Sequence, residues 1–219
     1  ACWTVPENYR LVGIDASGLE LRMLAHELND KGYTNEILNG DIHTTNQRLA
    51  EIESRDQAKT FIYALLYGAG DAKLGSVVGR GRAVGKGLRQ RFFDNLPAFK
   101  KLTDRVQREA KSGFIKALDG RKLTVRSEHA ALNTLLQGAG AIVMKKALII
   151  LDDKITKHGW DAKFVANVHD EWQIECHVDD AVAVGEAGVH AIREAGCMFN
   201  LNCPLDGAYK VGENWSETH

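Results

Sequence analysis

Residues 11–22 read LVGIDASGLELR, and this stretch sets how the chain begins to fold. Its apolar run ends in Asp15, a Ser-Gly pair favours a tight turn, and apolar residues then recur with helical spacing. The pattern predicts a strand over 11–16, a turn and a helix. An acid at the end of an apolar strand is costly unless a cation meets it, so Asp15 is a candidate metal ligand.

A second acidic position lies 155 residues further along the chain, at Asp170. Residues 163–168 and 172–177 predict two strands, and the polar turn between them holds His169, Asp170 and Glu171. Two acids at strand ends invite a shared cation, and hard oxygen ligands favour Mg²⁺ or Mn²⁺ over zinc. A capping acid followed by an exposed turn acid explains the same pattern equally well.

Four side chains spaced by four residues form another cluster: Arg55, Lys59, Tyr63 and Tyr67. This spacing places them on one face of the helix predicted over 54–67. Two cations followed by two aromatics match the polarity of a nucleoside triphosphate, whose phosphates and base need those partners. An ordinary amphipathic helix with half-buried tyrosines is an equal alternative.

The chain has 219 residues, of which 44% are hydrophobic and 26% charged, and this excludes a disordered or fibrous protein. The formal net charge of -1 hides an uneven distribution, because residues 73–126 hold 15 Lys and Arg against 4 Asp and Glu. A basic block interleaved with glycines favours binding to phosphates, although a solvated helical face has a similar composition. No signal peptide, long uninterrupted apolar run or CxxC pair is found, which predicts a soluble protein in a reducing compartment.

The remaining pattern indicates mixed α+β organisation rather than regular βαβ units. Gly81 to Lys86 falls short of a P-loop, and the spacing of Cys197 and Cys203 fits buried free cysteines better than a zinc site. The further predicted elements are helices over 41–50, two short helices in the glycine-rich region, helices over 97–111, about 129–156 and 179–195, a hairpin over 114–125 and a strand over 205–212.

Three segments taken together resemble family A DNA polymerases. Residues 15–22 (DASGLELR) resemble motif A, residues 55–68 (RDQAKTFIYALLYG) resemble motif B, and residues 168–171 (VHDE) resemble motif C, in the same order and spacing. The likeness continues through residues 40–44, 118–122 and 131–137 and is strongest to the T7-like phage branch of the family. It implies an antiparallel palm sheet that carries the catalytic carboxylates, with an inserted helical fingers subdomain and without thumb or exonuclease. The implied division is palm over 1–40, fingers over 41–112 and palm over 113–219.

The resemblance also implies a role for each matching residue. Asp15 and Asp170 would hold two Mg²⁺ ions, with Mn²⁺ as a substitute, and Glu171 would support that site. Lys59 would bind the triphosphate and donate a proton to the leaving pyrophosphate. The other implied nucleotide contacts are His43, Arg55, Tyr63 and Glu20, the last excluding a ribose 2′-hydroxyl. A tyrosine rather than a phenylalanine at position 63 resembles family members that accept dideoxynucleotides readily. The implied DNA contacts are Tyr67, Asn133, Gln137, His169 and Arg126.

Only fourteen residues precede Asp15, and this predicts a second polypeptide that supplies thumb, exonuclease and the rest of the palm. The other expected partners are primer-template DNA and dNTP, without a membrane, in the cytoplasm of an infected bacterium. Ala1-Cys2 also permits a protein-splicing junction, and His129 stands where the bacterial branch tends to carry Arg.

Three other function classes share some of these features: a non-catalytic DNA-binding scaffold, a metal-dependent nuclease and a related RNA polymerase. Asp15, Lys59 and Asp170 argue against the scaffold. The helix of Arg55 and Lys59 has no evident role in a nuclease, and Glu20 argues for deoxynucleotides.

Overall fold

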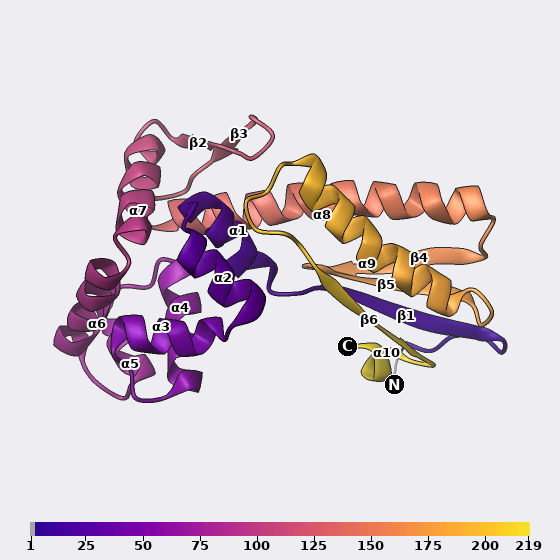
Figure 1. Cartoon of the computed structure of the whole chain (residues 1–219), viewed down its shortest axis with the longest axis horizontal. Coiled ribbons are helices and arrows are strands. Elements are labelled where there is room, and N and C mark those ends of the chain that lie inside the picture. The colour runs from indigo at the N-terminus through magenta and orange to yellow at the C-terminus, as the bar shows by residue number, and fades with distance from the viewer. Residues whose placement is uncertain (1–2) are drawn as a thin grey trace. The chain divides into compact units, whose positions relative to one another are not determined.

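The computed structural model describes residues 3–219, so the proposed splicing junction at Ala1-Cys2 lies outside the described residues. The chain divides into two compact units, one made of residues up to Arg22 with Ala139–His219, and the other of Met23–Gly138. Figure 1 labels the helices and strands, which are β1 (Tyr9–Ala16), α1 (Leu19–Leu28), α2 (Lys31–Asn39), α3 (Ile42–Ala50), α4 (Arg55–Leu66), α5 (Asp71–Val77), α6 (Arg82–Asn95), α7 (Pro97–Ala110), β2 (Phe114–Lys116), β3 (Lys122–Thr124), α8 (Ala131–His158), β4 (Ala162–Val168), β5 (Glu171–His177), α9 (Ala181–Met198), β6 (Gly207–Gly212) and α10 (Trp215–Thr218). A 3-10 turn (Glu128–Ala130) precedes α8.

The first unit is built on a four-stranded sheet in the order β4-β5-β1-β6, with every neighbouring pair antiparallel. The apolar run of β1 lies between β5 and β6, where Val12 and Ile14 are fully buried. Helix α9 packs closely against this sheet, because a Cβ at Gly188 would lie 2.4 Å from Ile14 Cδ1 and one at Gly185 would lie 2.2 Å from Tyr209 Cδ2. These small residues let the helix backbone lie close to the strands.

The opposite face of the sheet carries the short helix α10. Successive side chains of a strand point to opposite faces, so Gly13 and Asp15 face away from Ile14 and from α9. A Cβ at Gly13 would lie 2.5 Å from the carbonyl oxygen of Thr218, which places α10 directly on β1. The end of β1 that carries Asp15 therefore shares its face with the last residues of the chain.

The second unit is mainly helical and has an aromatic core. Phe61 of α4, Phe92 of α6 and Phe99 of α7 are almost completely buried. The ring centroids are 5.8 Å apart for Phe61 and Phe92 and 5.2 Å apart for Phe92 and Phe99, both with edge-to-face geometry. Because α4 buries this apolar stripe, its polar side chains lie on the outer face.

The sequence pattern had favoured an open phosphate-binding surface for the glycines of the basic region. Two of these glycines are instead packing residues inside the helical unit. Gly75 and Gly85 are buried where α5 meets α6. A Cβ at Gly85 would lie 1.9 Å from the carbonyl oxygen of Asp71, and one at Gly75 would lie 2.2 Å from that of Gly81. Backbone contact between the helices thus requires glycine at both positions.

Helix α8 is the long helix predicted from the apolar period, and it has 28 residues. Together with the preceding 3-10 turn it is long and apolar enough to cross a membrane by length and composition alone, with half of its apolar window buried. A buried core helix meets the same criteria. The helix α2 and the helix α10 are present although the sequence pattern had not indicated either.

Candidate active site

Asp15 and Asp170 come together at neighbouring strand ends of the first unit. Asp15 is the register partner of Glu171 across β1 and β5, and the backbone N–H of Ala16 donates to the carbonyl oxygen of Asp170 at 3.1 Å. The chain between them returns through β4 and a two-residue turn, as the predicted hairpin required. Two acids separated by 155 residues in the sequence therefore occupy one edge of the sheet.

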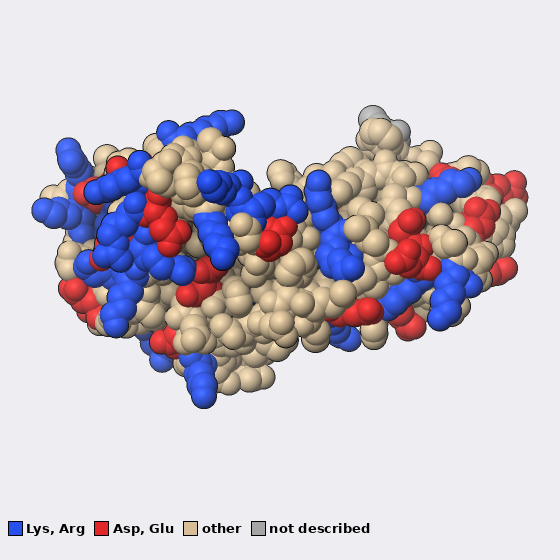
Figure 2. Space-filling model, turned by 90° about the horizontal axis from the view of Figure 1, so that it is seen from above, with Lys and Arg blue, Asp and Glu red and all other residues tan. Residues whose placement is uncertain are grey.

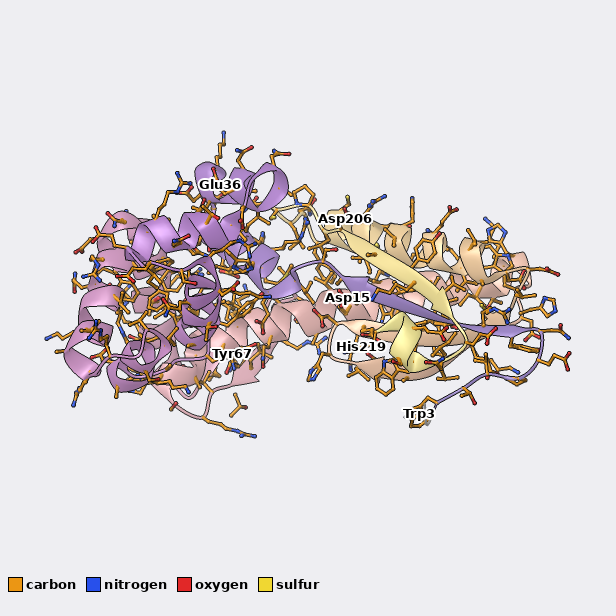
Figure 3. All side chains as sticks on the ribbon, turned by 90° about the horizontal axis from the view of Figure 1, so that it is seen from below. Trp3, Asp15, Glu36, Tyr67, Asp206 and His219 are labelled. Atoms are coloured by element: carbon orange, nitrogen blue, oxygen red, sulfur yellow. The ribbon has the colours of Figure 1, made fainter. Side chains whose placement is uncertain are left out.

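The charges at this edge oppose one another. Burial, followed by the carboxylates of Asp170 and Glu171, raises the pKa of Asp15 to about 6, against the opposing effects of His219 and Lys210. Figure 3 shows Asp15 on β1 and His219 beyond α10 on this part of the unit. The cations of the chain thus leave part of the negative charge at Asp15 without compensation, and an added cation would lower that cost.

Asp15 and Asp170 suit a cation that keeps other ligands. Within residues 3–219, no group of three or more His, Cys, Asp or Glu side chains has the geometry to hold a metal ion. Mg²⁺ is commonly bound by one or two carboxylates, with water and substrate phosphates completing its shell. Two carboxylates from the chain therefore fit Mg²⁺ or Mn²⁺ and fit a closed zinc site poorly.

Glu171 is held by partners that the sequence analysis missed. The residue is only 7% exposed, and its Oε1 accepts from Trp215 Nε1 at 3.2 Å and from Gln173 Nε2. Its Oε2 lies 2.6 Å from His219 Nδ1. The alternation of polar residues at 171, 173 and 175 in an apolar strand was the available signal, because it marks one polar face.

His169 is the first residue of the turn between β4 and β5. Its backbone adopts the left-handed conformation with φ of 56°, and its side chain is exposed. Histidine is one of the non-glycine residues that enter this region more often than most. The turn therefore presents His169 to solvent next to Asp170.

The second unit carries the predicted cation and aromatic face. Arg55, Lys59 and Tyr67 are exposed along α4, and Tyr63 is half-buried between Lys59 and Tyr67. The ring centroid of Tyr63 lies 6.4 Å from that of Tyr67 and 6.3 Å from that of His43 on α3. The structure thus brings these five predicted residues onto one side of the α3 and α4 pair.

His43 is a neutral imidazole beside two cations. Burial lowers its pKa most, and Arg55 and Lys59 lower it further. Its Nδ1 is buried and has no hydrogen-bond partner among the described residues. Such an unsatisfied nitrogen is costly without a ligand, so it is available to a bound polar group.

Asp41, the first residue of the helix predicted over 41–50, also pairs with Arg55, a contact that the sequence did not indicate. Its side chain accepts from the backbone N–H of His43 at 3.0 Å and so begins α3, as predicted. It also accepts from Arg55 Nε at 2.6 Å and from Arg55 Nη2 at 3.1 Å. The Arg55 hydrogen bonds hold the pKa of Asp41 well below its usual range, and the bidentate pair fixes the guanidinium at the start of α4.

The residues of the second unit that are predicted to contact DNA are exposed or half-exposed. Asn133 and Gln137 are four residues apart on the outer face of α8, and Arg126 is exposed in the bend after β3. A Cβ at Gly68 would lie 2.3 Å from the carbonyl oxygen of His129, so the end of α4 touches the start of α8. Tyr67, labelled in Figure 3, is therefore near that junction and is 50% exposed.

The basic block covers much of one face of the second unit, where Figure 2 shows Lys and Arg gathered. Five of its 15 Lys and Arg side chains pair with acids, and three of those acids come from outside the block. Those that pair with acids are Arg89, Arg91, Lys100, Arg105 and Arg121. The other Lys and Arg side chains of the block form no ion pair within the described part of the chain, and they leave the face positive.

The described cysteines, Cys176, Cys197 and Cys203, form no disulfide. Cys203 is buried as expected, and burial raises its pKa. Cys197 is exposed, so the prediction that it is buried was wrong. It lies in the last turn of α9, next to Gly196, which is the last buried residue of the helix, and outside the buried stripe.

Comparison with known proteins places this architecture. A sequence model of DNA polymerase family A matches residues 1–217, and the chain belongs to this family. It is 48% identical to the DNA-directed DNA polymerases of Enterobacteria phage T3 and Escherichia phage T7, covering 94% of this chain and 33% of each relative. It is 33% identical to DNA polymerase I of Aquifex aeolicus, covering 96% of this chain and 40% of that relative. The phage likeness expected from the motifs is confirmed.

The fold agrees with a solved structure. The POL domain of Pol1 from M. smegmatis, in complex with DNA primer-template and dNTP, superposes with a TM-score of 0.87 at 24% identity, covering 98% of this chain and 41% of that chain. This confirms the predicted α+β fold class. The chain spans about a third of the length of the phage relatives that it matches.

Proposed function

We propose that this chain is the catalytic part of a template-directed DNA polymerase, which adds dNTPs to a primer 3′-hydroxyl by nucleotidyl transfer. The observation that carries the proposal is the meeting of Asp15 and Asp170 at one sheet edge in a family A fold. Burial and the neighbouring carboxylates of Asp170 and Glu171 together raise the pKa of Asp15, which supports a site built for cations.

Asp15 and Asp170 are the residues proposed to hold two Mg²⁺ ions, or Mn²⁺ in their place. When bound, such ions lower the pKa of the primer hydroxyl and neutralise charge on the triphosphate. Glu171, with both oxygens already engaged, is proposed to support these carboxylates rather than to ligate an ion.

The face of α3 and α4 is proposed to bind the incoming nucleotide. Arg55 and Lys59 offer positive charge to the β- and γ-phosphates, and Lys59 donates a proton to the leaving pyrophosphate. His43, neutral and with a free Nδ1, accepts or donates one hydrogen bond at the triphosphate. Tyr63 packs against the sugar and base, and Glu20 on α1 excludes a 2′-hydroxyl.

Primer and template contacts are proposed for residues that are exposed or half-exposed. Asn133 and Gln137 read minor-groove acceptors that are common to all correct base pairs, so they test shape without sequence. Tyr67 stacks near the templating base, and His169 lies at the primer end. Arg126 and the unpaired cations of the basic block contact phosphates.

The relatives extend well beyond the matched region, so we propose that full activity needs segments that they carry outside it, such as a thumb and an exonuclease. A second polypeptide is one way to supply them. We retain the division into palm over 1–40, fingers over 41–112 and palm over 113–219 as the functional assignment. The phage relatives suggest that the protein acts in the cytoplasm of an infected bacterium.

Primer extension tests this function. The chain is incubated with primer-template, dNTPs and Mg²⁺, alone and with a polypeptide that carries the missing segments of a phage relative. Asp170→Asn is expected to lower extension by at least about a hundredfold, because it removes a metal ligand, and Lys59→Ala by about a hundredfold, because it removes the proton donor. Asp153→Asn changes an exposed acid on α8 and is the matched control, with wild-type extension expected.

Unchanged extension in Asp170→Asn would contradict the catalytic assignment and favour a scaffold that only binds DNA. Shortening of the primer instead of lengthening would indicate a nuclease. Strong processive extension by the chain alone would refute the need for added segments.

A further inference from the structure

Glu171 is a buried carboxylate whose two oxygens are both taken up by the chain. Oε1 accepts from Trp215 Nε1 at 3.2 Å and from Gln173 Nε2, and Oε2 lies 2.6 Å from His219 Nδ1. A carboxylate that is only 7% exposed stays charged at modest cost only when its lone pairs have such partners. Two of the three partners come from the last five residues of the chain.

A second contact from the same segment orients Gln173. The hydroxyl of Thr218 donates to Gln173 Oε1 at 2.8 Å. Because the amide oxygen is held by this donor, the amide nitrogen is directed to Glu171. Thr218 therefore acts on Glu171 through Gln173, whereas Trp215 acts on it directly.

The segment itself is seated in a fixed place on the sheet. A Cβ at Gly13 would lie 2.5 Å from the carbonyl oxygen of Thr218, so β1 and α10 are in backbone contact. The backbone N–H of Trp215 donates to the carbonyl oxygen of Trp3 at 3.3 Å, and Lys210 Nζ donates to the backbone oxygen of His219 at 3.0 Å. These contacts join α10 to β1, to β6 and to the segment that precedes β1.

We propose that Trp215 and Thr218 are positioning residues, which fix the Glu171 carboxylate beside its strand partner Asp15 and thereby set the arrangement in which Asp15 and Asp170 receive a divalent cation. Released from Trp215, Glu171 could rotate toward Asp15 and compete for the cation or displace its ligands. The inference rests on the proposed function, because it assigns α10 a task at the same carboxylates. Neither Trp215 nor Thr218 touches the reacting groups.

Divalent cation binding tests this inference without measuring catalysis. Free Mn²⁺ is quantified by electron paramagnetic resonance in titrations of the chain, with Asp15→Asn defining binding that does not depend on the carboxylates. Trp215→Phe keeps the ring and removes the N–H donor, and Thr218→Val keeps the shape and removes the hydroxyl. Trp160→Phe makes the same chemical change at a tryptophan that stacks on His158, 4.6 Å between centroids, and is the matched control.

We expect Trp215→Phe to weaken Mn²⁺ binding about tenfold and Thr218→Val by a smaller factor, as for other partners of metal-binding carboxylates. Thr218→Ser should restore wild-type affinity, because it returns the donor, and Trp160→Phe should leave it unchanged. Thermal melts of each variant identify loss of folding, and a variant that fails to fold is replaced by Gln173→Leu, which removes the amide between Thr218 and Glu171.

Wild-type Mn²⁺ affinity in folded Trp215→Phe and Thr218→Val would overturn the positioning role and leave the proposed function intact. Equal weakening in Trp160→Phe would overturn it as well, because the effect would then be general. A wild-type chain that binds no more Mn²⁺ than Asp15→Asn would contradict the metal site of the proposed function itself.

Discussion

The packing of α5 on α6 yields a pair of substitutions with opposite expected signs. Gly85 and Gly87 lie in the same helix, α6, two residues apart. A Cβ at Gly85 would lie 1.9 Å from Asp71 O and 2.5 Å from the nitrogen of Gly75, whereas one at Gly87 would meet only the end of the Arg91 side chain at 3.4 Å. Alanine therefore destabilises the chain at position 85 and is accommodated at position 87.

The magnitudes follow from two terms. Replacing glycine by alanine in a helix interior gains about 1 kcal/mol through helix propensity, and this is the whole effect expected for Gly87→Ala. At Gly85 the new methyl overlaps two backbone groups, which do not move like a flexible side chain, so the helices must separate. Overpacking of this kind costs about 3 kcal/mol, which leaves a net loss of about 2 kcal/mol for Gly85→Ala.

Two spectroscopic signals separate the units in the assay. The four tryptophans, at positions 3, 160, 172 and 215, all lie in the first unit, so their fluorescence reports on that unit. Circular dichroism at 222 nm also reports on the helices of the second unit. In urea titrations, Gly85→Ala should lower the circular dichroism midpoint and Gly87→Ala should raise it. A Gly85→Ala midpoint equal to that of wild type would refute the backbone-contact argument.

Three further predictions concern the carboxylates, the nucleotide face and the core. With metal ions chelated, Asp15→Asn should stabilise the chain by about 1 kcal/mol at pH 8, after allowance for solvent screening, and hardly at all at pH 4. The sign follows from the pKa of about 6 in the folded chain: above that pH the ionised Asp15 carboxylate destabilises the fold, and this cost disappears as the carboxyl is protonated. Thermal melts of Asp15→Asn and wild type at both pH values test the prediction, and an equal effect at pH 8 and pH 4 would contradict it. Tyr63→Phe should lower dideoxynucleotide incorporation relative to deoxynucleotide incorporation, since the resemblance links tyrosine at this position to ready acceptance, and an unchanged ratio in gel-based termination assays would speak against that role. Phe92→Ala should cost about 3–5 kcal/mol in urea titrations, because its ring contacts two other buried rings; a loss below about 1 kcal/mol would mean that the core collapses into the space.

Much of the fold could be predicted where a strong local pattern coincides with tertiary burial. The apolar run before Asp15, the four-residue spacing from Arg55 and Pro97 at the start of α7 each specify type and place. Helix α2 was missed because Tyr33 is its one buried residue, so it has no apolar stripe to detect. Helix α10 was missed because a single turn of four residues is too short for any period.

The candidate site could be predicted only in part for a similar reason. An acid at a strand end is visible in the sequence, so Asp15 and Asp170 could be named before the strands were paired. The contacts of Glu171 with Trp215 and of Arg55 with Asp41 depend on how distant segments meet. Burial of Gly75 and Gly85 likewise depends on helix packing, and composition alone indicated a surface.

The position of β1 in its sheet has a consequence for the order in which the chain folds. This strand precedes every other described helix and strand in the chain, yet it pairs with β5 and β6, which come after most of them. The helical unit is continuous in the sequence, so it can fold while synthesis continues. The strand that carries Asp15 must wait, unpaired and apolar, until about 190 residues more have been made. We expect nascent chains that stall before residue 207 to bind chaperones through this strand, because one of its edges then has no partner.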